Sequence, residues 1–295
     1  MRKRIVPIFL AAALALLASA CGGGGESRSQ TRIVAAFYPL AFLAERLAPT
    51  AEVTTLTPAG AEPHDLELTP REVAALADAD LVLYLGQGFQ PALERAVRGK
   101  ANALDLLDGL ELIEGSEGDG SHSEGDGSHA LDPHVWLDPL RFAAMAERVA
   151  EALGEPGAAD GLVADLQELD EEFRDGLADC ERDVIVTSHA AFGYLADAYG
   201  LRQLALSGLS PEAEPSPRAL EGLVAEVRRS QATTVFFETL VSPKVAETVA
   251  REAGVRTAVL NPLEGLTEQE LENGADYVSV MRENLAALRQ ALGCA

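Results

Sequence analysis

Short apolar runs alternate with amphipathic stretches along most of the chain after residue 31. Apolar runs bounded by turn residues predict strands, and apolar residues that recur every three or four positions predict helices. The predicted strands are 33–37, 53–56, 81–85, 184–186, 204–206, 235–237 and 257–260. The predicted helices are 40–47, one that begins at Thr69 with a capping box to Glu72, 93–97, 139–153, 158–178, 190–199, 218–229, 244–253 and 268–292.

Strands that alternate with helices predict parallel sheets covered by helices on both faces. The chain has 295 residues, 47% of them hydrophobic, which allows about two domains. The amphipathic stretch 158–179 divides the pattern into an amino-terminal lobe, 31–157, and a carboxy-terminal lobe, 180–295. We therefore expect an α/β protein of two lobes that are joined by a long rigid helix, with a cleft between them.

The first 30 residues have the organisation of an export signal. Three basic residues at 2–4 precede an apolar stretch that ends in small residues before Cys21. This pattern resembles a bacterial lipoprotein signal, so we expect a signal peptide over 1–20, a lipidated Cys21 and a flexible tether over 21–30. An uncleaved anchor and a plain secretory signal are the alternatives. We expect the protein on the outer face of the cytoplasmic membrane, attached through Cys21.

The other two cysteines, Cys180 and Cys294, form a plausible pair in an oxidising compartment. A bridge between them would close a long loop and fix the last helix to the second lobe. Two free thiols are the alternative.

The net charge of −24 argues against a nucleic-acid partner, because phosphates require a basic surface.

No Lys or Arg lies between Lys100 and Arg141, and the loop 115–130 within that stretch contains a tandem heptapeptide, Ser-Glu-Gly-Asp-Gly-Ser-His. This acidic repeat ends in His122 and then His129. It is either a loop that gathers cations or a solvated insertion.

Three further histidines are candidate metal ligands. His64 and His189 follow predicted strands, and His134 follows the acidic loop. Ligands of open α/β sheets bind beyond the carboxyl ends of the strands, so all three side chains are expected in one cleft. Glu264 follows the last predicted strand and is the expected fourth ligand, with Asn261, a weaker, neutral donor, or a water molecule as the alternatives. Three imidazoles and one carboxylate suit Zn²⁺ better than Mn²⁺.

An exported zinc hydrolase would use a similar donor set. Such an enzyme needs a general base beside the metal, and the sequence has no His-Glu-x-x-His motif. Asp65 is a nominal base, but we expect it to orient His64 or to cap its loop. We therefore expect no enzymatic activity.

Four segments resemble the zinc- and manganese-type solute-binding proteins of bacterial ABC transporters. They are Pro-His-Asp-Leu-Glu-Leu-Thr-Pro at 63–70, Asp-Pro-His-Val-Trp-Leu-Asp-Pro at 132–139, Ser-His-Ala-Ala-Phe-Gly-Tyr-Leu at 188–195 and Leu-Ser-Pro-Glu-Ala-Glu-Pro-Ser-Pro at 209–217. The resemblance implies metal held between two lobes, with His64, His134 and His189 on the family's imidazole positions. Manganese members tend to have a carboxylate at the third position, so His189 favours zinc. Many relatives have Asp where this chain has Asn261.

The resemblance implies a monomeric zinc receptor that delivers Zn²⁺ to a metal ABC permease and its ATPase subunit. The chain lacks the Gly-x-x-x-x-Gly-Lys-Ser/Thr loop and is therefore not the ATPase itself. A manganese receptor of the same family is one alternative. A metal-binding adhesin is another, from a different class.

Overall fold

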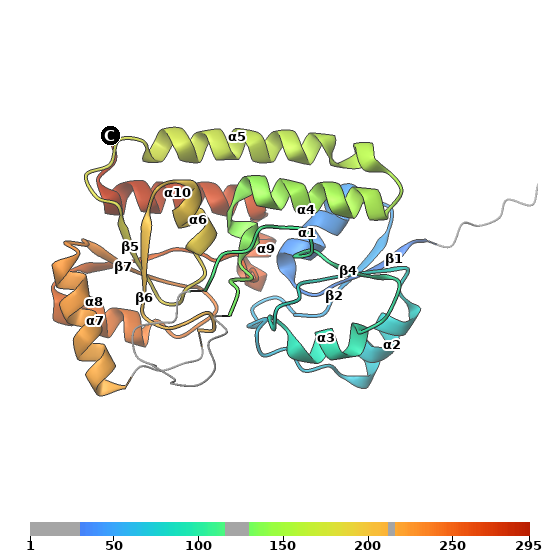
Figure 1. The fold of residues 1–295 in the computed structure, drawn as a ribbon, viewed down its shortest axis with the longest axis horizontal. Coiled ribbons are helices and arrows are strands. Elements are labelled where there is room, and N and C mark those ends of the chain that lie inside the picture. Colours follow the sequence, from blue (N-terminus) through green and yellow to red (C-terminus); the bar gives the residue numbers. More distant parts are fainter. Residues whose placement is uncertain (1–29, 116–129, 212–215) are drawn as a thin grey trace, which may run out of the picture.

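A computed structural model describes residues 30–115, 130–211 and 216–295. Cys21, His122 and His129 lie outside these described residues. Within them the chain forms two four-stranded parallel sheets, each flanked by helices, as the alternating pattern predicts (Figure 1). No helix in the described ranges is long and apolar enough to cross a membrane.

The first sheet has the strand order β2-β1-β3-β4. Its strands are β1 (Arg32–Ala35), β2 (Glu52–Thr55), β3 (Leu81–Tyr84) and β4 (Ala103–Asp105). Helices α1 (Tyr38–Leu47) and α4 (Pro139–Ala152) cover one face, and α2 (Pro70–Asp78) and α3 (Pro91–Val97) cover the other (Figure 1). Our sequence prediction missed β4, a strand of three half-buried residues without a continuous apolar run.

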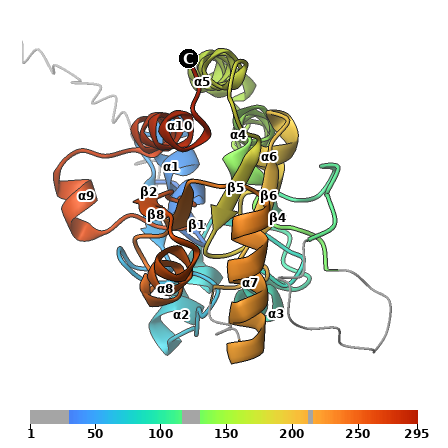
Figure 2. The same ribbon diagram turned by 90° about the vertical axis from the view of Figure 1, so that its left-hand side faces the viewer.

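The second sheet repeats the same order as β6-β5-β7-β8. Its strands are β5 (Val184–Thr187), β6 (Arg202–Ala205), β7 (Thr234–Phe237) and β8 (Arg256–Val259). Helices α6 (Gly193–Ala198) and α10 (Tyr277–Leu292) lie on one face, and α7 (Pro217–Arg229) and α8 (Lys244–Ala253) lie on the other (Figures 1 and 2).

The predicted helix 268–292 is wrong as a single element. It divides into α9 (Glu268–Glu272) and α10, and the break contains Gly274 with a φ of 79°. Glycine adopts this left-handed conformation without steric cost and ends helices for that reason. Asp276 then caps α10 by accepting a hydrogen bond from the backbone N of Ser279 at 2.8 Å. The capping box predicted for α2 is present, with Thr69 and Glu72 bonded reciprocally.

Helix α5 (Asp160–Leu177) runs along the outside of the molecule and spans both sheets (Figure 1). Its apolar stripe is buried against α4 and α10 and consists of Leu162, Leu166, Leu169, Phe173 and Leu177. Arg282 of α10 also forms a bidentate pair with Glu172 of α5, with its Nη2 atom 2.6 Å from the carboxylate. The stripe predicted from the sequence is therefore the face that connects the two halves.

A disulfide joins Cys180, just after α5, to Cys294, just after α10. This is the pairing that we expected from the cysteine count. It fixes the end of the chain beside the start of β5, where Arg182 N also donates to Leu292 O at 3.2 Å.

Replacing both Cys180 and Cys294 by serine should lower the free energy of unfolding by about 4–5 kcal/mol, because the bridge closes a loop of more than 100 residues. Denaturant unfolding of the chain from residue 22 onward checks this value, with the reduced wild-type protein as the matched control. A loss below about 1 kcal/mol would contradict a stabilising role for the bridge.

Candidate metal centre

Four side chains from four separate segments converge in the space between the two sheets. They are His64, His134, His189 and Glu264, and their ligand atoms all lie within 4.8 Å of one another. The Oε1 atom of Glu264 is 3.3 Å from Nε2 of His64 and 3.1 Å from Nε2 of both His134 and His189. The structure thus brings together the residues that the sequence nominated as a metal site.

The parallel topology explains this convergence. His64 follows β2, His189 follows β5 and Glu264 follows β8, so each lies beyond the carboxyl end of a strand. His134 is the N-cap of the 3₁₀ turn η1 (Val135–Leu137) that leads into α4. The carboxyl ends of parallel strands meet at one edge of a sheet, so loops that follow the strands of both sheets can bring their side chains within 4.8 Å of one another.

The loop of Glu264 is held rigidly by hydrogen bonds. Asn261 N donates to Asn284 Oδ1 at 2.8 Å, and Asn284 Nδ2 returns a bond to Asn261 O at 2.7 Å. Leu263 has a φ of 57° and donates its backbone N to Asn261 Oδ1 at 2.8 Å. Trp136 Nε1 reaches across from the first half to Pro262 O at 2.8 Å.

Two carboxylates that our sequence prediction missed orient two of the imidazoles. Asp132 Oδ1 accepts a bond from Nδ1 of His134 at 2.7 Å, and Glu238 Oε1 accepts one from Nδ1 of His189 at 2.6 Å. Each bond places a proton on Nδ1, so Nε2 is the ring nitrogen that faces Glu264 and that can bind a metal ion once it has given up its own proton. The Asp-Pro-His spacing at 132–134 was a sequence signal for Asp132, whereas the role of Glu238 follows only from the pairing of β7 with β5.

Space for Asp132 depends on Gly193. A Cβ atom at residue 193 would lie 2.6 Å from Asp132 Oδ2, which is too close for a side chain of any size. Tyr194 OH donates to Asp132 O at 2.7 Å and holds the same segment from α6. The position of His134 is therefore tied to the second half of the chain as well as to the first.

Two other predicted contributors are placed differently. Asn261 is buried, but its side chain bonds back to its own loop at Leu263 N and lies 3.4 Å from Glu270 Oε1. Asp65 is exposed, and within the described residues no hydrogen bond joins it to His64. The backbone N of His64 instead donates to Glu62 Oε1 at 3.2 Å.

Burial and charge act in opposite directions on the ligands. Burial alone would lower the pKa of His134 and of His189. Asp132 and Glu264 raise the pKa of His134 above the ordinary histidine value, and Glu238 and Glu264 do the same for His189. Burial alone would raise the pKa of Glu264, but the three imidazoles hold it well below the usual range. Burial, and next the charge of Glu264, raise the pKa of Glu62 to about 8.

The donor set fits a tetrahedral zinc ion. Three imidazole nitrogens and one carboxylate oxygen are characteristic zinc ligands, and three of the four side chains are completely buried. Glu264 Oε2 is buried and accepts no hydrogen bond from any described residue. Of the ligand atoms in the cluster, this oxygen is therefore the one that the described residues leave unsatisfied.

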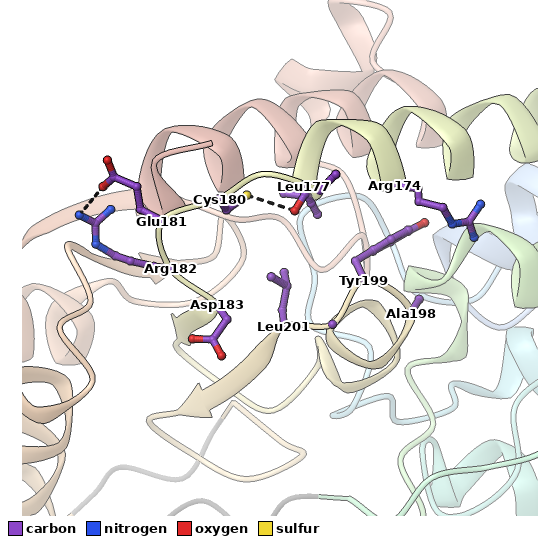
Figure 3. A pocket seen from close by; sticks show the side chains of 11 residues that line it. Arg174, Leu177, Cys180, Glu181, Arg182, Asp183, Ala198, Tyr199 and Leu201 are labelled. Carbon is purple, nitrogen blue, oxygen red and sulfur yellow. Dashed lines mark hydrogen bonds and ion pairs between the residues drawn. The ribbon is translucent and has the colours of Figure 1, made fainter. Parts of the chain in front are cut away.

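A hollow of about 480 Å³ lies elsewhere, at the outer end of the second half (Figure 3). It is lined by Cys180, Arg182 and Tyr199 among others, and it contains none of the four converging side chains. Two of its charged groups are paired with each other, since Arg182 Nη2 lies 2.9 Å from Glu181 Oε2. The hollow therefore adds nothing to the metal cluster.

Comparison with known proteins gives one consistent result. The family of the zinc-uptake complex component A, periplasmic (ZnuA), matches residues 33–291. The zinc-binding lipoprotein AdcA of Streptococcus pneumoniae is 37% identical over 303 residues, which cover 97% of this chain and 60% of AdcA. The high-affinity zinc uptake system protein ZnuA of Bacillus subtilis is 36% identical over 315 residues and 99% of both chains.

A solved structure gives the same match. The crystal structure of Zn(II)-bound AdcA from S. pneumoniae superposes with a TM-score of 0.75 at 35% identity, over 89% of this chain and 58% of that one. The chain thus spans about 60% of the length of AdcA, whereas it matches the B. subtilis protein over nearly its whole length.

Glu264→Gln should lower the pKa of both His134 and His189 in the metal-free protein, because it removes the carboxylate shared by their Nε2 atoms. A histidine whose pKa is raised on folding stabilises the folded state fully at a pH below the pKa of an unfolded histidine. This stabilisation is lost as the pH rises through the pKa of the folded state. NMR titration of the imidazoles measures the shift, with Glu268→Gln on exposed α9 as the control. Unchanged imidazole pKa values would contradict the pairing.

Proposed function

We propose that this chain, which belongs to the ZnuA family of zinc-uptake complex components, is the zinc-binding receptor of an ABC-type importer. It captures Zn²⁺ outside the cytoplasmic membrane and delivers it to a permease that is driven by a separate ATPase subunit. The observation that carries the proposal is the convergence of three imidazoles and one carboxylate in a buried cleft. Relatives named for zinc binding and zinc uptake support the same conclusion.

We assign Zn²⁺ to His64, His134, His189 and Glu264. Four side-chain donors complete a tetrahedral shell without a position for a reacting water, which favours binding over hydrolysis. A site for Mn²⁺ would contain more oxygen donors than this one does. The ion is the cargo of the protein, so the shell must both hold it tightly and release it.

Release is proposed to follow from docking on the permease, which separates the two halves and pulls Glu264 away from His64 and His134. Cys21 is proposed to carry the lipid that keeps the receptor, as a monomer, at the outer face of the membrane. The segment between Cys21 and β1 then serves as the tether. His122 and His129 are proposed as a secondary, weaker collecting site.

Calorimetric titration of the chain from residue 22 onward should reveal one tight Zn²⁺ site and much weaker Mn²⁺ binding. His189→Ala should weaken zinc binding by at least about 100-fold, because it removes one of four ligands. Replacing both His122 and His129 by alanine is the matched control and should leave the tight site intact. Zinc binding that is weak and indifferent to His189 would refute the assignment.

Zinc affinity should fall as the pH decreases, because zinc displaces the protons that His134 and His189 hold through their raised pKa. At pH 7 we expect release of about one proton or more per zinc ion. Titrations in buffers of different ionisation enthalpy measure this number. A binding enthalpy that does not depend on the buffer would show that the imidazoles were already neutral.

A further inference from the structure

Glu238 contacts the ring of the ligand His189 from a neighbouring strand. It follows β7 directly, and β7 pairs with β5, the strand that leads into His189. Only 3% of Glu238 is exposed. Its Oε1 atom accepts a hydrogen bond from His189 Nδ1 at 2.6 Å and another from the Ser188 hydroxyl.

The other two imidazoles are held differently. Asp132 lies two residues before His134, and its Oδ1 accepts both the backbone N–H, at 2.9 Å, and the ring Nδ1–H of that histidine. Its geometry is therefore fixed by its own short segment. Among the described residues, His64 has no carboxylate on its Nδ1 atom. Glu238 and His189 are 49 positions apart, so their contact exists only because the two strands are adjacent.

No Lys or Arg among the described residues pairs with Glu238. In the described part of the chain its only ion-pair partner is His189, and its Oε2 atom is buried without a hydrogen-bond partner. The hydrogen bonds of the Glu238 carboxylate are therefore directed at Ser188 and His189. A carboxylate on Nδ1–H makes the opposite nitrogen, Nε2, a stronger donor to a metal.

We propose that Glu238 is a positioning residue that sets the preference of the site for zinc over manganese, an inference that rests on the zinc-receptor function proposed above. Zinc gains more than manganese from a strongly donating imidazole, because Mn²⁺ favours carboxylate and water oxygens. Glu238 acts through the charge that it places behind His189, in addition to fixing the orientation of the ring.

Glu238→Gln and Glu238→Ala separate charge from orientation, because glutamine can still accept the Nδ1–H bond but carries no charge. Both variants should raise the zinc Kd by about 10- to 100-fold, while the manganese Kd changes by less than about threefold. Competition titrations with Zn²⁺ and Mn²⁺ measure both constants. The visible absorption bands of bound Co²⁺ should shift in both variants, since they report the donor strength of the ligands.

The matched control is Asp105→Asn. Asp105 is a half-buried carboxylate at the carboxyl end of β4 that accepts bonds from Gly86 N and Leu107 N and contacts no imidazole. This variant should lower the free energy of unfolding without changing the ratio of the zinc Kd to the manganese Kd. It therefore distinguishes a specific effect on His189 from the general loss of a buried charge.

The inference is overturned if Glu238→Gln binds zinc within about threefold of the wild type, or if zinc and manganese affinities fall equally. If neither variant folds, ¹⁵N NMR of the zinc-loaded wild type decides the matter. It should show His189 protonated on Nδ1 and bound through Nε2, and the reverse assignment would overturn the inference. Failure of the wild type itself to bind zinc would instead refute the proposed function.

Discussion

The Oε1 atom of Glu264 lies 3.1–3.3 Å from an Nε2 atom of three different histidines, and every other feature of the cleft serves this arrangement. A buried carboxylate is costly unless its charge is compensated, and here three imidazoles provide the compensation. The pKa shifts of Glu264, His134 and His189 in opposite directions are the electrostatic consequence. A divalent cation satisfies the same atoms without the protons.

The packing behind the cluster keeps the two halves in register. Trp136 is completely buried, donates to Pro262 O and accepts a bond from Tyr277 OH at 2.6 Å. Tyr277 in turn stacks on Phe42 and Phe142 of the first half, with ring centroids 5.7 and 4.3 Å apart. These contacts, together with α5, position residues that are up to 200 positions apart in the chain. The site is therefore supported by an aromatic core to which both halves contribute.

Much of this arrangement follows from local patterns that a sequence displays. Apolar periodicity defines the α/β alternation and the stripe of α5, and strand ends followed by histidine indicate His64 and His189. The structure also has features that depend on tertiary context. The short β4 strand is held in the sheet by its pairing with β3. The break between α9 and α10 occurs at the single residue Gly274, within a longer stretch whose apolar pattern is helical. Asn261 looks like a donor in sequence but is used to shape its own loop.

The partnership of Glu238 with His189 could not be read from the sequence, because it depends on which strands are neighbours. The two-residue spacing of Asp132 and His134, by contrast, is a local feature that the sequence displays. Local contacts between ligands and their supporting carboxylates are thus predictable in principle, whereas contacts across strands require the topology.

X-ray absorption at the zinc edge of the zinc-loaded protein tests the central claim most directly. The account predicts four light ligands at about 2.0–2.1 Å, with the multiple scattering of three imidazoles and one carboxylate oxygen. Loss of the oxygen contribution in Glu264→Gln, with the three imidazoles retained, would identify the fourth ligand. A six-coordinate shell made mostly of oxygen atoms, or a shell with fewer than three imidazoles, would contradict the assignment of these four residues as the zinc site.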